Sequence, residues 1–302
     1  MNIINFETFL VTIFVLVDDW CQTQKTLVTP QSPGVQPSMD NSEIITLVLM
    51  MDYFPFPGET QFLAFIKANY HQWFPHLLTQ SQFNRRLRKL AHIIENLRRS
   101  WVLQLGAADA TNFIIDTKPI PVVGYNRNKL KSDFEGSASY GYCATRKMKY
   151  FGYKLVIICT LNGIPIAYDL VPANTDERKA AQGVLTVVQG CNIYADKGFI
   201  GQDWQQQIST QTGNQIFTVA RANQLKQRKQ EVKRLIGRIR QRIEGVFHEI
   251  QNTGRNPERF LNKTIGGLNT HMAAKVASHT LRVLLRKKLG IDVLRFQSTS
   301  AA

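Results

Sequence analysis

The sequence is poor in cysteine and in acidic residues, and it contains no long uninterrupted apolar segment. Its four cysteines lie far apart without a C-x-x-C pair, which argues against a disulfide framework or a zinc site and fits a reducing cytoplasm. The longest apolar run, residues 9–17, is shorter than the roughly 20 residues that span a membrane, and no signal-peptide pattern precedes it. We therefore expect a packed amphipathic helix here, and no membrane partner.

Basic residues outnumber acidic residues by a wide margin. The 37 Lys and Arg residues and the 22 Asp and Glu residues give a formal net charge of +15, and the sequence pI is about 9.8. Such an excess indicates a polyanionic partner, either nucleic acid or an anionic membrane surface. With 302 residues, 44% apolar and 20% charged, the chain is expected to form about two globular domains.

The first hundred residues show the periodicity of helices. Apolar residues recur at helical spacing from Phe83 to Leu97, which predicts a helix over this segment. Its other faces are basic and carry Arg85, Arg86, Arg88 and Lys89. These side chains either contact DNA or form a solvated face. We expect residues 1–105 to form a helical N-terminal domain.

From about residue 110 the pattern becomes that of an α/β domain. Short apolar runs predict buried strands at residues 112–116, 154–160, 164–168, 191–196 and 215–219. Asn162-Gly163 suits a hairpin turn between two of them, and Pro165 places the second at a sheet edge because proline cannot donate to a ladder.

Helices are expected after the hairpin and near the C-terminal end of the domain. The N-x-x-E pattern that starts at Asn174 predicts a capping box and a helix to about Val188. An apolar stripe predicts a long helix from about 236 to 250. We expect residues 124–150 to form a surface insertion between the first two strands.

Three carboxylates occupy positions that favour chemistry. Asp116 and Asp196 are each expected to end a buried strand, where ligand sites form in open α/β sheets. Glu244 is expected at the border between the apolar stripe and solvent on the long helix. The alternatives remain open: a strand-terminal Asp often serves a turn, and Glu244 could pair with Arg240 one turn earlier.

A dense basic run leads into Glu244. Its members, within 22 residues, are Arg221, Lys226, Arg228, Lys229, Lys233, Arg234, Arg238, Arg240 and Arg242. The run suits phosphate binding next to a metal-assisted cleavage site, although a solvated face would look the same. Converging carboxylates can hold two Mg²⁺ ions about 3.5–4 Å apart for phosphoryl transfer. No P-loop, G-x-S-x-G or H-E-x-x-H pattern is present, so ATPase, α/β-hydrolase and zincin functions lack support.

Three segments resemble the catalytic blocks of DDE transposases of bacterial insertion sequences. The matching segments are IDTKPIPV at 115–122, YADKGF at 194–199 and RQRIE at 240–244. The order Asp, Asp, Glu and the spacings of 80 and 48 residues are typical of this group, and weaker likeness extends over nearly the whole chain. Some relatives carry a Tyr and a Lys seven residues before and after the Glu, where this chain has Gly237 and Gln251.

The resemblance implies a fold, a site and a reaction. It implies an α/β fold for residues 106–302, with a ribonuclease H-like mixed sheet flanked by helices and followed by C-terminal helices. The helical domain before it would bind DNA ends. Asp116, Asp196 and Glu244 would hold two Mg²⁺ ions, or two Mn²⁺ ions instead. The enzyme would hydrolyse the phosphodiester at the element's ends and then join the freed 3′-hydroxyl to target DNA. Cytoplasmic, nucleoid-associated action as a homo-oligomer on double-stranded DNA is expected.

Residue roles around this site follow from the same resemblance. Basic residues expected to contact DNA are Lys118, Lys197, Lys233, Arg234 and Arg240, together with the four basic residues at 85–89. We interpret Asp176 and Glu177 instead as acids in the first turn of a helix, where the helix dipole favours negative charge. Two alternatives stay open: a ribonuclease H-like nuclease that does not join strands, and a degenerate copy that only binds DNA and represses its element.

Overall fold

We describe a computed structural model of the chain, which covers residues 5–28, 37–123, 133–143, 146–218, 230–258 and 261–291. Contacts divide the chain into two compact units: a helical unit, Met1–Trp101 with Asn252–Ala302, and a sheet unit, Val102–Gln251. The first boundary lies near the predicted one at residue 105. The C-terminal segment differs from prediction, because it clusters with the N-terminal helices and not with the sheet.

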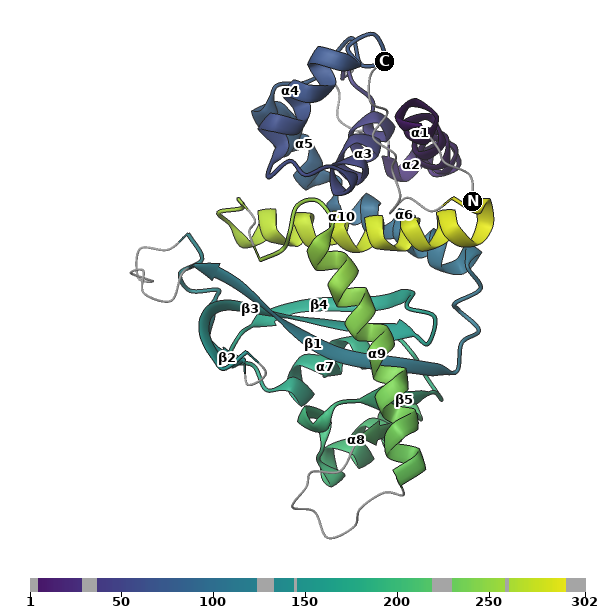
Figure 1. Ribbon diagram of the computed structural model, residues 1–302, viewed down its shortest axis with the longest axis vertical. Helices are drawn as coiled ribbons and strands as arrows, with labels where there is room; N and C mark the ends of the chain where they lie inside the picture. Colours follow the sequence, from purple (N-terminus) through teal and green to yellow (C-terminus); the bar gives the residue numbers. More distant parts are fainter. Residues whose placement is uncertain are drawn as a thin grey trace. The chain divides into compact units, whose positions relative to one another are not determined.

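The helical unit confirms the helical character of the first hundred residues. Its helices are α1 (Phe6–Thr23), α2 (Lys25–Val28), α3 (Asn41–Met50), α4 (Glu59–Asn69), α5 (Gln80–Lys89), α6 (Ala91–Gln104) and α10 (Ile265–Leu284), with short turns at Met51–Tyr53 and Leu285–Leu289 (Figure 1). The apolar run at 9–17 lies in α1, where it supplies one buried face, as predicted. Among the described helices, none combines the length and apolar character needed to cross a membrane.

The helix predicted over 83–97 is in fact two helices. α5 ends at Lys89, Leu90 adopts φ −92° and ψ 0°, and α6 begins at Ala91. The apolar spacing could not reveal this break because steps of three and four residues continue through a one-residue interruption. Thr79 and Gln82 form a capping box at the start of α5.

A buried ionic cluster explains why residues after 251 belong to the helical unit. Asp52, which is 1% exposed, lies 2.8 Å from Lys275 Nζ, 3.5 Å from an Arg282 nitrogen and 3.7 Å from an Arg255 nitrogen. The three cations come from α10 and the segment just before it. Because a buried carboxylate needs cationic partners, this cluster ties the C-terminal helix to the N-terminal ones.

The sheet unit contains six strands in a mixed sheet. They are β1 (Asn112–Val123), β2 (Ser139–Cys143), β3 (Met148–Thr160), β4 (Pro165–Pro172), β5 (Asn192–Ala195) and β6 (Gln215–Thr218), in the order β2-β3-β1-β5-β6 with β4 also paired to β3. β1–β5 and β5–β6 are parallel, and the other pairs are antiparallel. This confirms the predicted mixed sheet.

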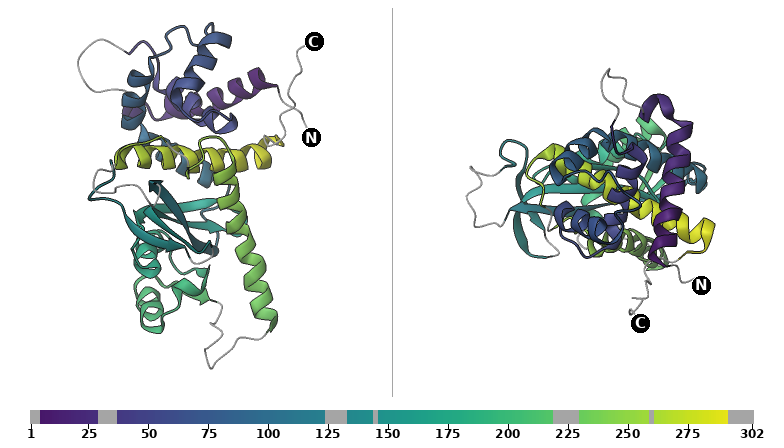
Figure 2. Two further views of the ribbon diagram at one scale, coloured as in Figure 1. Left: turned by 60° about the vertical axis from the view of Figure 1, so that its left-hand side comes forward. Right: turned by 90° about the horizontal axis from the view of Figure 1, so that it is seen from above.

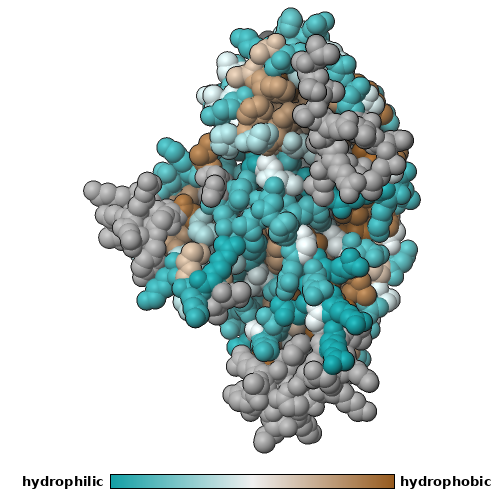
Figure 3. All heavy atoms as spheres, in the orientation of Figure 1, coloured by the Kyte–Doolittle hydropathy of each residue, from teal (hydrophilic) through white to brown (hydrophobic). Residues whose placement is uncertain are grey.

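Helices cover both faces of this sheet. α7 (Glu177–Leu185) and α8 (Gln202–Thr212) lie on one face, and α9 (Gln230–Asn252) lies on the opposite face (Figure 2). Phe113, Ile115, Ile193 and Ala195 belong to the core under α7 and α8. Since side chains alternate along a strand, the residues between and after them face α9. The outer surface on the α9 side is mainly hydrophilic (Figure 3).

Several local predictions are confirmed. Gly163 takes φ +77° in the β3–β4 turn, and the strands at 191–196 and 215–219 form as β5 and β6. β4 lies at the sheet edge, since β3 is its only partner among the described strands. The long helix predicted around 236–250 is α9.

Other local predictions are wrong. β1 continues to Val123, past Asp116, because β3 pairs with it over that length. From Asp116 onward β5 no longer pairs with β1, so Pro119 and Pro121 can turn their missing N–H toward that open side. Part of the expected surface insertion forms β2 and the start of β3. The helix after β4 is capped by Asp176, not by Asn174.

Candidate active site

Two aspartates meet beneath α9. The last paired residues of β1 and β5 are Ile115 and Ala195, so Asp116 and Asp196 follow side by side on the face that α9 covers. Arg240 of α9 reaches both: its Nη2 lies 3.6 Å from Asp116 Oδ2, and its Nη1 lies 3.2 Å from Asp196 Oδ1. A single guanidinium therefore forms ion pairs with both carboxylates.

A cavity of about 540 Å³ opens around this pair. Four carboxylates line it, Asp116, Glu177, Asp196 and Glu244, and so do the basic side chains Lys118, Arg146, Lys154 and Arg240. Glu244 is exposed on α9, one turn after Arg240. All three predicted catalytic carboxylates thus line one cavity, although only the two aspartates share a bridging partner.

Burial raises the pKa of Asp116 to about 6. The Thr117 N–H, which donates to Asp116 Oδ1 at 2.8 Å, and the Arg240 guanidinium both lower this pKa, whereas the charges of Asp196 and Glu177 raise it. Burial, the largest of these effects, therefore outweighs the stabilisation of the charged form by Thr117 and Arg240. A further cation placed among them would favour the ionised form of Asp116.

Glu177 belongs to this cavity, contrary to the prediction that it serves only the helix dipole. Its Oε1 accepts a hydrogen bond from Thr117 Oγ1 at 3.1 Å. A Cβ on Gly198 would lie 1.3 Å from Glu177 Oε2, so the carboxylate lies directly against that glycine. Gly198, two residues after Asp196, was the sequence signal that another group packs closely there. Asp176, by contrast, is exposed and caps α7, as its first-turn position indicated.

The predicted DNA-contacting residues of the sheet unit have different surroundings. Lys118 donates to Gln251 Oε1 at 2.8 Å and lies over the Phe247 ring. Lys197, next to Asp196, and Arg234 on α9 are exposed. The side chain of Lys233 and all of residues 221–229, the first part of the basic run, lie outside the described residues.

The basic residues of α5 are also not equivalent. Arg85, Arg88 and Lys89 are exposed. Arg86 is half-buried and donates to the Met39 carbonyl and to Asn41 Oδ1, the latter at 2.6 Å. Arg86 therefore anchors α5 to the start of α3, which differs from the predicted DNA contact.

The donors around Asp116 fit a hard divalent cation in part. They are carboxylate oxygens, the ligands Mg²⁺ prefers, and a cationic group already lies between two of them. In the described ranges, no three His, Cys, Asp or Glu side chains converge closely enough to hold a metal ion. The aspartate pair is in place, whereas a three-carboxylate cluster is not assembled.

The sequence model of the family described as Transposase DDE domain matches residues 107–272, more than half of the chain. The chain belongs to this transposase family. All four cavity carboxylates lie within the matched segment. The resemblance to DDE transposases is thus confirmed for the family, and an origin in a bacterial insertion sequence stays a prediction.

Among solved structures, the chain is similar to one described as a cryo-EM structure of the piggyBac transposase synaptic complex with hairpin DNA. The identity is 14% and the TM-score 0.34, over 71% of this chain and 49% of that one, so this transposase spans about half the length of its structural relative. A comparison with curated proteins gave no match.

Proposed function

We propose that this transposase binds the terminal inverted repeats of an insertion sequence and catalyses metal-dependent DNA cleavage and strand transfer. Asp116, Asp196 and Glu244 are its metal-binding carboxylates. The juxtaposition of Asp116 and Asp196 within the family's matched segment, with a cation between them, is the observation that carries this proposal. A ribonuclease H-like sheet is part of it, supported by antiparallel β3 and β1 beside parallel β5 and β6.

Two Mg²⁺ ions, or Mn²⁺ in their place, would activate the attacking oxygen and stabilise the leaving oxygen of an in-line phosphoryl transfer. The aspartates would hold them by their oxygens, and Glu244 would supply a third carboxylate from α9. Lys118 and Lys197 flank the aspartates in sequence and bring positive charge to the place where a phosphate would lie.

The proposed partner is double-stranded DNA, both transposon ends and target. The net charge of +15 supports a polyanionic partner, and exposed Arg85, Arg88, Lys89 and Arg234 offer phosphate contacts. Bringing two ends together would require a homo-oligomer. Action in the bacterial cytoplasm, at the nucleoid, follows from the DNA substrate.

A strand-transfer assay tests the proposal against its alternatives. A labelled duplex carrying the element's end is incubated with the full chain, Mg²⁺ and an unlabelled target duplex. We expect nicked ends and larger joined products, both absent with EDTA. Nicking without joined products would favour a nuclease that does not join strands. Binding without nicking in any divalent metal would favour a DNA-binding repressor.

A further inference from the structure

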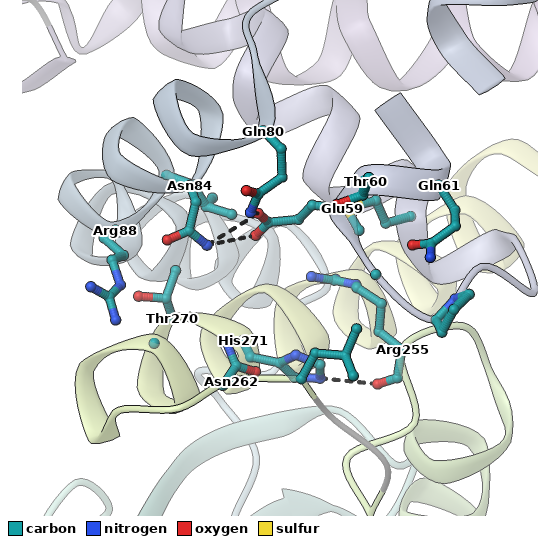
Figure 4. A pocket seen from close by; sticks show the side chains of 16 residues that line it. Glu59, Thr60, Gln61, Gln80, Asn84, Arg88, Arg255, Asn262, Thr270 and His271 are labelled. Carbon is teal, nitrogen blue, oxygen red and sulfur yellow. Dashed lines mark hydrogen bonds between the residues drawn. The ribbon is translucent and has the colours of Figure 1, made fainter. Parts of the chain in front are cut away.

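The helical unit contains a cavity of its own, of about 300 Å³. It is lined by the first turn of α4, by the first two turns of α10, by α5 from its first residue onward, and by the segments that precede α4 and α10. Figure 4 shows the labelled side chains converging on it from these elements, with Arg88 and Arg255 on opposite sides. The catalytic residues proposed above lie in the other unit and take no part in it.

Arg255 is the unusual side chain of this cavity. Its side chain is only 6% exposed, and its Nε and Nη2 atoms have no hydrogen-bond partner within the part of the chain that the structure describes. The nearest carboxylate, Asp52, lies 3.7 Å from Nη2, beyond hydrogen-bond distance, and also serves Lys275 at 2.8 Å. Burial lowers the pKa of the Arg255 guanidinium, and the charges of Asp52 and Glu59 oppose that shift. Buried donors of this kind normally have an acceptor.

The backbone holds Arg255 in this position. Its φ of +53° lies in the left-handed region, which non-glycine residues seldom adopt. The Arg255 carbonyl accepts a hydrogen bond from His271 Nε2 at 2.9 Å (Figure 4), and burial lowers the pKa of His271 to about 3, so this ring is neutral. The strained conformation is therefore fixed from α10, and it keeps the guanidinium directed into the cavity.

The charge around the cavity is positive. Arg255, Lys275 and Arg282 face the single carboxylate of Asp52, and exposed Arg88 adds a further cation at the cavity. The one acid in the lining, Glu59, accepts hydrogen bonds from Gln80 and Asn84 (Figure 4). α4 also presents its amino-terminal turn, where the helix dipole favours anions, whereas at the start of α10 the Gly267 N–H already donates to Thr264 Oγ1.

We propose that this cavity binds an anion with the chemistry of a phosphate, held by the forked guanidinium of Arg255 and by Arg88. A guanidinium matches phosphate oxygens in a bidentate manner, which would satisfy both donors of Arg255 that lack acceptors. The phosphate comes either from the backbone of bound DNA or from free solution. This site goes beyond the proposed active site and does not depend on DNA cleavage.

Inorganic phosphate is the probe for the first test. Its binding to the full chain, without divalent metal, is measured by calorimetry and by the melting temperature, against sodium chloride at matched ionic strength. Arg255→Lys keeps the charge but loses the fork, and Arg88→Gln removes the second cation. We expect phosphate to bind about tenfold more weakly to each variant. Lys67→Gln, exposed on α4 but outside the lining, should bind phosphate as wild type does.

Two results would overturn the proposal: no effect of phosphate beyond that of ionic strength, or equal phosphate binding by wild type, Arg88→Gln and Arg255→Lys. If Arg255→Lys does not fold, the comparison of Arg88→Gln with Lys67→Gln still tests the proposal. A second arm identifies the source. Competition between phosphate and a short duplex in wild type, weakened in Arg88→Gln, supports a DNA phosphate; phosphate binding without competition supports free phosphate. Neither arm measures strand cleavage, so loss of that activity leaves this test intact.

Discussion

Asp116 and Asp196 lie side by side on neighbouring parallel strands, one residue beyond the last register pair of β1 and β5. Both point to the face that α9 covers, since their neighbours Ile115 and Ala195 belong to the core on the other face. Eighty residues separate them in the sequence, and the parallel pairing brings them together. The Arg240 guanidinium then bridges the two carboxylates.

Arg240→Gln should change the response of the transposase to divalent cations. Without the guanidinium, the two carboxylates repel each other, and we expect the metal-free variant to melt a few degrees lower, for a loss of about 1 kcal/mol. Added Mg²⁺ should then raise its melting temperature more than that of wild type, because no side chain competes for the aspartates. Arg238→Gln, exposed on the same helix, is the control. Equal Mg²⁺ responses in all three proteins would refute this role of Arg240.

Glu177→Gln should reduce cleavage by at least about tenfold if its charge acts in the cavity, a loss of roughly 1.4 kcal/mol. The fold should persist, because a glutamine oxygen can still accept the hydrogen bond from Thr117. The matched control is Asp203→Asn, an exposed acid in the first turn of α8 that does not line the cavity. The measurements are the initial cleavage rates and the melting temperatures of both variants. Similar cleavage rates for both would mean that Glu177 only stabilises the start of its helix.

Gly198→Ala tests the same carboxylate by displacement. The added methyl group would occupy the position of Glu177 Oε2, so the Glu177 side chain must move and lose its bond from Thr117. We expect a loss of about 1 kcal/mol in the free energy of unfolding. In a Glu177→Ala background the same Gly198→Ala change should cost little, because the clash is gone and the bond from Thr117 is already absent. Urea unfolding measures both, and additive losses would show that the two residues do not meet.

Asp52→Asn should destabilise the helical unit by about 3–5 kcal/mol at neutral pH, because it leaves buried cations unpaired. Burial raises the pKa of Asp52, but Lys275, Arg255 and Arg282 outweigh it and hold the pKa below its ordinary value of 3.8. The stability from its charge is therefore present above about pH 4 and is lost as pH falls through the lower native pKa.

Denaturant unfolding followed by helical circular dichroism checks the Asp52 prediction. The difference between wild type and Asp52→Asn should shrink between pH 5 and pH 2. Asp19→Asn, exposed on α1, should behave as wild type throughout. A difference that is independent of pH would mean that the charge of Asp52 does not stabilise the fold.

Short-range patterns predicted much of the sheet unit. Strand alternation, the Asn162-Gly163 turn and Pro165 depend on neighbours in sequence, and the structure has each of them as predicted. The Asp116 and Asp196 segments were recognised because each is a short apolar run that meets an acid and each resembles a catalytic block of DDE transposases. That Asp116 lies inside β1 could not be predicted, since it depends on how far β3 pairs alongside β1.

Contacts between distant residues set the limits of prediction. Glu177 looked like a helix-dipole acid because Gly198, 21 residues later, packs on it only in the folded chain. Asp52 and Lys275 are 223 residues apart, so nothing local showed that the C-terminal helix joins the N-terminal unit. Arg86 looked like its neighbours on α5, and only the position of Met39 and Asn41 separates it from them.

The most direct test of the proposed catalytic site compares cleavage and binding in the same preparations. Wild type, Asp116→Asn and Glu244→Gln are given a labelled duplex of the element's end, with Mg²⁺ or with EDTA, and binding is measured by anisotropy. We expect metal-dependent nicking by wild type, at least about a thousandfold slower in both variants, with binding of the duplex retained. Nicking by Asp116→Asn or Glu244→Gln at the wild-type rate would contradict the assignment of these carboxylates to catalysis.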